Sequence, residues 1–286
     1  MILLNLCIQK QVPIVLMHGV LEDGSAMNDV AKWLQQEVPD LHVRICDVGM
    51  GKEESIFTSL EYQLEQFVIC VNNDPLLKDG FIGMGFSQGG LVIRGYLQRY
   101  NHIKFPMLRF IGLSSPLAGE FCGYDSLCLF ALYPSDWLNE LVHNVFLSDF
   151  MFEHFSISSY WRDPYHLQEY FQIGRYLLDL DNQKTFNPIY KKNFVSVDKM
   201  ILFGSEHDGV IQPWQSSWFG MWKEGGDSDV ELMEERDVYK QDLFGLKTLN
   251  EEGKIVLRKT NNNHLNNVHN QKFIVEELAP FVKMDV

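Results

Sequence analysis

Residues 81–97 constrain the fold of this chain more than any other stretch. They begin with the apolar run FIGMGF, which is typical of a buried strand, and end in an apolar pattern with helical spacing. Between the two, Gly85, Ser87 and Gly89 fit the pattern G-x-S-x-G. A serine at such a tight strand-to-helix turn needs neighbours without Cβ atoms, because strand and helix almost collide there. The stretch therefore predicts a nucleophile elbow, with a serine hydroxyl held at the edge of a sheet.

Ser87 is the candidate nucleophile of this turn. The N-terminus of the following helix would offer backbone N–H groups and a positive dipole end to an oxyanion that forms beside the serine. The alternative is a glycine-rich turn with a solvated serine. The apolar strand before Ser87 and the helical pattern after it favour the elbow.

Strand-like apolar runs alternate with helical patterns along the chain. The expected strands are 13–17, 41–46, 81–86, 108–113, 199–204 and 254–258. Helices are expected between them, including one at 55–71, and at 271–282. Short connections between alternating strands and helices predict a mainly parallel, doubly wound sheet. We therefore expect the α/β class with an α/β-hydrolase-like order, as a single domain over residues 1–286.

The pattern changes between about 119 and 193. This segment is rich in aromatic residues, and its apolar spacing is helical and irregular. We expect a lid-like insertion of short helices over the carboxyl edge of the sheet. Most of its rings would be core, but some would line an apolar groove for a long hydrocarbon, each buried methylene contributing about 0.8 kcal/mol.

Two further residues complete a candidate catalytic triad. Asp208 follows the strand 199–204, and His264 follows the last strand, so the chain order is serine, acid, histidine, as in α/β-hydrolases. Glu206 competes for the role of the acid, and His269 for the role of the base. Asp208 is preferred because apolar packing resumes directly behind it, and His264 because its loop follows the last strand.

Composition excludes several classes of function. The net charge of −14 argues against nucleic acid as a partner, because phosphate binding needs clustered Lys and Arg. No apolar run reaches the ~18 residues of a membrane span. No C-x-x-C pair or H-E-x-x-H motif indicates a metal site, and no G-x-G-x-x-G fingerprint indicates a dinucleotide. We expect no cofactor.

The five cysteines do not predict a disulfide framework. Cys122 and Cys128 are close enough in sequence to pair in a loop. Cys46 lies on an expected strand and Cys70 on an apolar helical face, where we expect buried thiols. The chain carries no N-x-S/T sequon. Its first ten residues lack a basic segment and a clear cleavage site, so either the protein is not secreted or this start is incomplete.

Several motifs together resemble the palmitoyl-protein thioesterase family, from about residue 13 to 282. They are His18-Gly19 after a strand, the elbow GFSQGG at 85–90, YWRDP at 160–164 and NHL at 263–265. The blocks LSSP at 113–116, DGVIQPWQSSWFG at 208–220 and FGLKTL at 244–249 look closest to the second type of this family.

The resemblance implies a lysosomal enzyme that hydrolyses long-chain acyl thioesters, with no cofactor. In the second type, covering loops favour acyl-CoA over acylated proteins. Val20 and Gln88 stand at the oxyanion positions of the family, through their backbone N–H groups. The missing sequons and paired cysteines depart from the family, so the lysosome or secretory pathway rests on resemblance alone.

Alternative functions also fit the sequence. A depalmitoylase of the first type or a carboxylester lipase would use the same scaffold. A non-catalytic acyl-binding protein is the alternative from another class. It would be favoured if a member of the triad were missing, and this chain has all three. The sequence gives neither chain-length preference nor oligomeric state.

Overall fold

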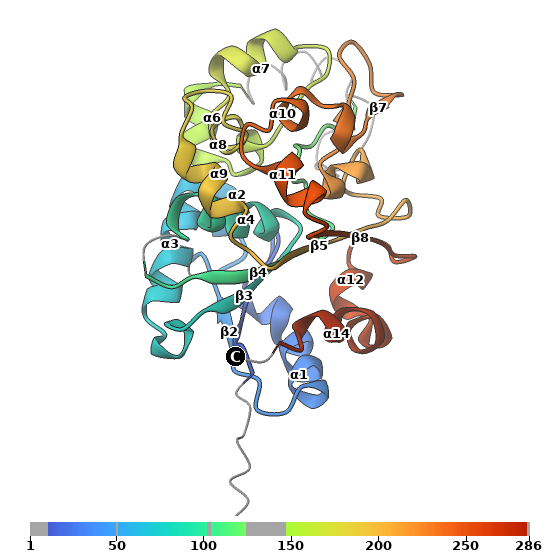
Figure 1. The fold of residues 1–286 in the computed structure, drawn as a ribbon. Helices are drawn as coiled ribbons and strands as arrows, with labels where there is room; N and C mark the ends of the chain where they lie inside the picture. Colours follow the sequence, from blue (N-terminus) through green and yellow to red (C-terminus); the bar gives the residue numbers. More distant parts are fainter. Residues whose placement is uncertain (1–10, 50, 102–103, 124–146, 285–286) are drawn as a thin grey trace, which may run out of the picture.

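A computed structural model describes residues 11–49, 51–101, 104–123 and 147–284. At its centre is a six-stranded sheet in the order β2-β1-β3-β4-β5-β8, in which every neighbouring pair is parallel (Figure 1). The strands are β1 (Ile14–Met17), β2 (Val43–Cys46), β3 (Phe81–Phe86), β4 (Met107–Leu113), β5 (Lys199–Gly204) and β8 (Ile255–Lys259). The expected parallel sheet is confirmed, with each strand within two residues of its expected bounds.

Two apolar cores cover the two faces of this sheet. One packs the sheet against α3 (Leu60–Asn72), α4 (Gln88–Tyr100) and apolar residues from the segments that follow β4 and β5. The other packs it against α1 (Asn28–Glu37) and the C-terminal helices. These are α12 (Asn266–His269), α13 (Gln271–Phe273), a π-helical turn (Ile274–Leu278) and α14 (Ala279–Val282). Helices on both faces make the sheet doubly wound, as the sequence predicts.

The single helix expected at 55–71 is two helices in the structure. α2 (Glu54–Phe57) ends at Thr58, and α3 begins after Ser59, whose side chain accepts a hydrogen bond from the Tyr62 N–H. A serine in extended conformation at this position caps a new helix, so the apolar spacing continues across a break.

A cap of short elements covers the sheet (Figure 1), and it is built from two segments of the chain. The described part of the expected insertion gives α6 (Asp149–His154), α7 (Leu167–Ile173), α8 (Tyr176–Leu180) and α9 (Pro188–Phe194). Residues 124–146 of that insertion lie outside the described residues. The second segment, between β5 and β8, adds the β6–β7 hairpin (Met221–Trp222 and Val230–Glu231), α10 (Asp237–Lys240) and α11 (Leu246–Glu251). The sequence pattern predicts only the first of these segments, and nothing in it indicates that the second one also belongs to the cap.

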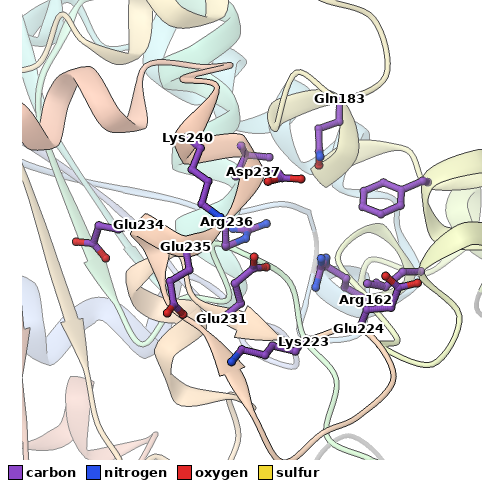
Figure 2. A pocket seen from close by; sticks show the side chains of 13 residues that line it. Arg162, Gln183, Lys223, Glu224, Glu231, Glu234, Glu235, Arg236, Asp237 and Lys240 are labelled. Carbon is purple, nitrogen blue, oxygen red and sulfur yellow. The ribbon is translucent and has the colours of Figure 1, made fainter.

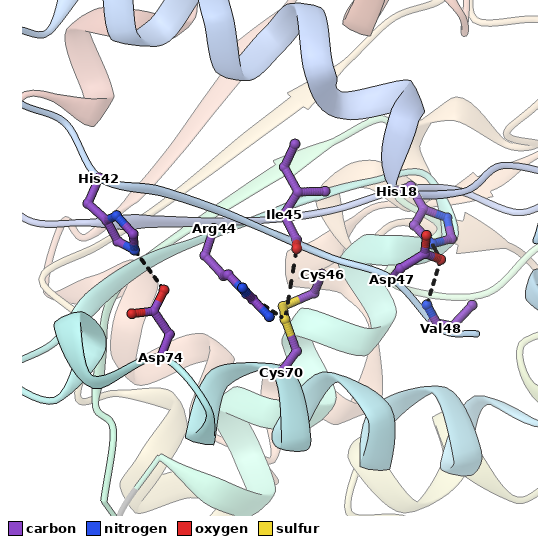
Figure 3. Close-up of a disulfide and its surroundings, with 9 residues drawn as sticks. All are labelled: His18, His42, Arg44, Ile45, Cys46, Asp47, Val48, Cys70 and Asp74. Carbon is purple, nitrogen blue, oxygen red and sulfur yellow. Dashed lines mark hydrogen bonds and ion pairs between the residues drawn. A yellow bond between two sulfur atoms is a disulfide. The ribbon is translucent and has the colours of Figure 1, made fainter. Parts of the chain in front are cut away.

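A disulfide joins Cys46 at the end of β2 to Cys70 in α3 (Figure 3). The expectation of two buried thiols at these positions is therefore wrong. The two residues are 24 apart in sequence, and only the packing of α3 beside β2 brings them together. Cys122 is also disulfide-bonded, and Cys128, its expected partner, lies outside the described residues.

No helix in the described ranges is both long enough and apolar enough to cross a membrane.

Candidate active site

Three loops meet at one edge of the sheet, where the parallel strands β3, β5 and β8 end. Ser87 follows β3 directly, Asp208 lies four residues beyond β5, and His264 lies five residues beyond β8. Carboxyl ends of parallel strands share one edge, and open α/β sheets bind ligands there. The structure thus brings together the three residues that the sequence places at strand ends.

Ser87 occupies a strained turn. Its φ of 52° and ψ of −129° are rare for a residue with a side chain, and α4 begins at the next residue. A Cβ atom at Gly85 would lie 2.4 Å from the Gly90 backbone nitrogen, and one at Gly89 would lie 2.4 Å from the His18 carbonyl oxygen. Only glycine fits at these two positions, as the elbow pattern predicts.

A continuous chain of hydrogen bonds links the three side chains. Ser87 Oγ is 3.0 Å from His264 Nε2, and His264 Nδ1 is 2.8 Å from Asp208 Oδ1. All three residues are buried. The His264 backbone N–H also donates to the Asp208 carbonyl at 2.9 Å, so the two loops are joined through the main chain as well.

The surroundings of Asp208 keep its carboxylate ionised. Burial alone would raise the pKa of Asp208, but hydrogen bonds from His264 and from the Ile211 N–H hold it below its ordinary value. A carboxylate fixed in this way selects the histidine tautomer that carries its proton on Nδ1 and accepts at Nε2.

Glu206 and His269, the two alternative candidates, are exposed and make no hydrogen bond to the triad side chains among the described residues. Glu206 is exposed and pairs with Lys259 at 2.7 Å. His269 is exposed at the end of α12. The geometry therefore favours Asp208 over Glu206 and His264 over His269.

The expected oxyanion residues belong to two segments that lie next to Ser87. Gln88 is the first residue of α4, where helical N–H groups have no acceptor within the helix. The loop that carries Val20 passes close to the serine, since a Cβ atom at Gly19 would lie 3.1 Å from Ser87 Cβ. The imidazole of His18 holds this loop, with Nδ1 2.8 Å from the Gly19 carbonyl and Nε2 3.1 Å from Asp47.

A buried network holds the side chain of Gln88. Its amide nitrogen donates to the Ser55 carbonyl at 2.8 Å and to Gln63 at 3.0 Å, and its amide oxygen accepts from the Tyr160 hydroxyl at 3.1 Å. Tyr160 belongs to the cap, so the cap is hydrogen-bonded to the residue that follows the serine. Sequence patterns missed this role, because Tyr160 is one of many aromatics in the insertion.

Glu120 is a buried carboxyl that the sequence did not single out. It accepts a hydrogen bond from the Gln212 N–H at 2.8 Å, and its main chain bonds to Tyr160 and Arg162. Burial raises the pKa of Glu120 well above its ordinary value, and nearby Asp208 raises it further, whereas the Gln212 N–H lowers it. Glu120 therefore joins the start of the insertion to the loop that carries Asp208.

Within the described part of the chain, no group of three or more His, Cys, Asp or Glu side chains could hold a metal ion. The chemistry available at this edge is that of a buried serine, a hydrogen-bonded histidine and an ionised carboxylate, with N–H groups beside the serine.

Comparison with known proteins identifies relatives over most of the chain. A model of the palmitoyl protein thioesterase family matches residues 13–264. Palmitoyl-protein thioesterase 3 of Dictyostelium discoideum is 31% identical, covering 88% of this chain and 84% of its own. Palmitoyl-protein thioesterase 1 of Caenorhabditis elegans is 29% identical, covering 90% and 87%. Lysosomal thioesterase PPT2 of Homo sapiens is 31% identical, covering 85% and 78%.

Solved structures show the same fold at low identity. A structure reported for the metagenome-derived lipolytic enzymes LipS and LipT has a TM-score of 0.52 and 10% identity, covering 96% of this chain and 94% of its own. Lipase BlEst2 of Bacillus licheniformis has a TM-score of 0.50 and 14% identity, covering 96% and 93%. Both likenesses support the α/β-hydrolase fold.

Proposed function

Because the chain belongs to the palmitoyl protein thioesterase family, we propose that it hydrolyses long-chain fatty acyl thioesters through an acyl-enzyme intermediate. In this proposal Ser87 is the nucleophile, His264 the general base and Asp208 the residue that orients the histidine. The observation that carries it is the hydrogen-bond chain from Ser87 through His264 to Asp208, with distances of 3.0 and 2.8 Å.

The first half of the reaction forms the acyl-enzyme. Ser87 Oγ attacks the thioester carbonyl carbon while His264 Nε2 takes the hydroxyl proton, and Asp208 stabilises the imidazolium that forms. The carbon–sulfur bond then breaks, and His264 Nε2 passes its proton to the departing sulfur, which leaves His264 neutral again. A thiol has a pKa near ~8.5, so this leaving group needs less protonation than an alkoxide. In the second half, His264 takes a proton from a water molecule whose oxygen attacks the acyl carbon. The bond to Ser87 Oγ then breaks, the proton returns to Oγ, and the fatty acid leaves.

The tetrahedral intermediate carries its charge on oxygen. The N–H groups of Val20 and Gln88 are the proposed donors to that oxyanion, and one such donor is worth roughly 10²–10³ in rate in comparable enzymes. The network from Gln63 and Tyr160 to Gln88 keeps this part of the turn in place.

Exposed apolar side chains next to the candidate site support an acyl substrate. Leu21, which follows Val20, is 55% exposed, and Leu265, which follows His264, is 54% exposed. Phe57 of α2 is 57% exposed, and its ring packs edge-on against Phe155 of the cap at 5.2 Å. Apolar groups that stay in water beside a catalytic turn gain most by burying a hydrocarbon chain, at about 25 cal/mol per Å².

The nucleophile assignment is tested with Ser87→Ala. We expect thioesterase activity on palmitoyl-CoA to fall at least about 10³-fold with no loss of thermal stability, because the small hydroxyl packs little. A serine-reactive fluorophosphonate should label Ser87 in the native chain. A tag on another residue, or turnover by the variant at more than a few per cent of the native rate, would overturn the assignment.

The head group is a separate question. We propose that the insertion at about 119–193 admits the acyl chain and restricts bulky leaving groups, as in the second type of the family. Acyl burial is the same for any palmitoyl substrate, so discrimination would come from access beyond the sulfur and would act on kcat/KM.

A substrate panel measures this preference. Palmitoyl-CoA should be turned over at least about tenfold faster than a folded S-palmitoylated protein, which is roughly 1.4 kcal/mol of transition-state free energy. A matched oxygen ester distinguishes a carboxylester lipase. Equal or faster hydrolysis of the acylated protein would assign the chain to the first type.

The names of several relatives support a proposal for the compartment. Several of them are named lysosomal thioesterases, including those of Homo sapiens and Rattus norvegicus, and we propose a lysosomal location for this chain. Co-localisation of the tagged full-length protein with a lysosomal marker tests it.

A further inference from the structure

The cap contains a cavity of about 570 Å³ that the catalytic proposal does not use. One wall comes from α7 and the loop before it, and the other comes from the β6–β7 hairpin and the segment around α10 (Figure 2). Ser87, Asp208 and His264 do not line it. Its volume lies within the range of small-molecule sites, ~300–1,000 Å³.

Two buried guanidinium groups form part of the cavity lining. Arg162 is 6% exposed and Arg236 is 3% exposed. Arg236 donates to the Phe219 carbonyl at 2.9 Å and to Asp181 at 3.3 Å. Arg162 donates only to the Trp222 carbonyl, at 3.4 Å, among the hydrogen bonds of the described residues. Its guanidinium has no carboxylate within ion-pair distance in that part of the chain.

The buried positive charge here exceeds that of the one buried carboxylate paired with it, and half-buried Glu231 on the cavity wall acts on Arg162 from beyond ion-pair distance. Asp181 already accepts from Arg94 at 2.6 Å, so it is shared between Arg94 and Arg236. We name these four residues the arginine cluster: Arg94, Arg162, Asp181 and Arg236. Its three buried guanidinium groups have one carboxylate at ion-pair distance, which leaves a surplus of two positive charges. Burying an unpaired charge is costly, so such a surplus favours a bound anion.

A second polar group beside the cluster lacks a partner. The Tyr170 hydroxyl is buried and makes no hydrogen bond within the described residues. Its ring lies 5.8 Å from the Arg162 guanidinium carbon. Burial lowers the pKa of Arg162 to about 10, with Arg236 contributing, so the group is still charged at neutral pH. The cluster thus holds donors and charge that the described protein groups do not satisfy.

We propose that this cavity binds a phosphate-type oxyanion through Arg162, at a site separate from the catalytic triad. A guanidinium fork matches two phosphate oxygens, and a phosphate dianion balances a surplus of two charges. In Figure 2 the Arg162 guanidinium and the Gln183 amide are directed into the space between the walls.

The remaining lining limits what can bind. Four of the five lining carboxylates are exposed and stand at the rim, where solvent and salt screen them, and Glu231 is half-buried. An acidic rim repels long polyanions such as nucleic acid but lets a small anion reach the arginines. Leu167, Phe171 and Val238 offer an apolar wall to an organic group attached to the phosphate.

The test measures anion binding by the purified full chain. Thermal unfolding and calorimetric titration are run at constant ionic strength with inorganic phosphate, glycerol 3-phosphate and acetate as probes. At about ten times its Kd, phosphate should raise the Tm by roughly 2–4 °C, and acetate should raise it less. Tighter binding of glycerol 3-phosphate would identify an organic phosphate as the ligand. Equal binding would identify the free ion. Either result supports the site.

Variants locate the site. Arg162→Met should weaken phosphate binding at least tenfold, whereas the control Lys240→Met, which removes an exposed rim cation, should change it less than twofold. Without phosphate, the Tm of Arg162→Met should equal or exceed the native value, because an unpaired buried charge is gone. A merely structural arginine would give a lower Tm.

Two outcomes would overturn the proposal. One is the absence of a saturable Tm rise with phosphate up to about 50 mM beyond that of chloride at equal ionic strength. The other is equal phosphate affinity in the native chain and Arg162→Met. If Arg162→Met does not fold, Arg162→Lys keeps the charge without the fork and should bind phosphate several-fold more weakly. Ser87→Ala should bind phosphate like the native chain, so failure here is distinguishable from failure of the catalytic proposal.

Discussion

The candidate triad and the arginine cluster are both buried polar groups, but they differ in how their charges are balanced. In the triad, each side chain has its hydrogen-bond partner within the group, with Ser87, His264 and Asp208 linked at 3.0 and 2.8 Å. In the arginine cluster, one carboxylate pairs with two of the three guanidinium groups, and Arg162 has no carboxylate at ion-pair distance within the described residues. The triad is complete without a ligand, and the arginine cluster is not.

We therefore expect substitutions in the candidate triad to lower the rate, and substitution of Asp181 in the arginine cluster to lower the stability. A closed hydrogen-bond chain holds reacting atoms ready, so a change there costs rate while the fold survives. A shared ion pair that ties the cap to the helix behind the nucleophile holds the two layers together, so a change there costs stability. Three substitutions test this separation.

The largest expected effect is on rate. His264→Ala should lower kcat/KM by about 10³–10⁴, because the base and the hydrogen bond to Ser87 are both lost. His269→Ala is the control, and we expect it to change kcat/KM less than about tenfold, because His269 is exposed. Steady-state hydrolysis of palmitoyl-CoA measures both. A larger loss at His269 would transfer the role of the base to it.

The next effect is on stability. Asp181→Asn leaves three buried guanidinium groups without a carboxylate, and should lower the free energy of unfolding by about 3–5 kcal/mol. Asp179→Asn is the matched control, since Asp179 pairs with Arg99 in a partly exposed bridge and should cost about 1 kcal/mol or less. Urea unfolding measures both free energies. Similar values for the two variants would remove the distinction between the arginine cluster and an ordinary surface pair.

The smallest effect concerns Glu120, which lies between the cap and the Asp208 loop. Because its pKa is raised in the folded state, its contribution to stability is full below about 4.5 and is lost as the pH rises through the raised value. Glu120→Gln does not titrate and lacks this loss. Its Tm should match the native Tm near pH 4 and exceed it at pH 7 by at least about 2 °C, since each pKa unit corresponds to about 1.4 kcal/mol. Parallel Tm curves for the two proteins across this range would contradict the raised pKa.

The sheet and the triad geometry could be predicted because they depend on local patterns. Each strand is an apolar run, and Ser87, Asp208 and His264 each follow such a run. Parallel strands then bring their following loops to one edge whatever the details of packing. The fold class is confirmed on this basis, whereas the catalytic roles stay proposals.

Other features depend on contacts between distant segments and leave no local trace. The Cys46–Cys70 disulfide was missed because each cysteine looked like an ordinary buried thiol on its own element. Arg94 lies on a helix that is buried along most of its length, and no feature of the sequence around it indicates an ion pair with Asp181, 87 residues away. The break at Ser59 was missed for the opposite reason, because the apolar spacing runs on across the cap of a new helix.

At Ser87, the residue that would give the most stable backbone differs from the residue that the proposed chemistry needs. A residue with a side chain at a φ of 52° carries strain of about 1–3 kcal/mol, which glycine would not carry. Selection for thermal stability alone would therefore favour glycine at position 87, and the hydroxyl would be lost. In the proposed mechanism the Ser87 hydroxyl is the nucleophile, so selection for turnover would keep serine at this strained position.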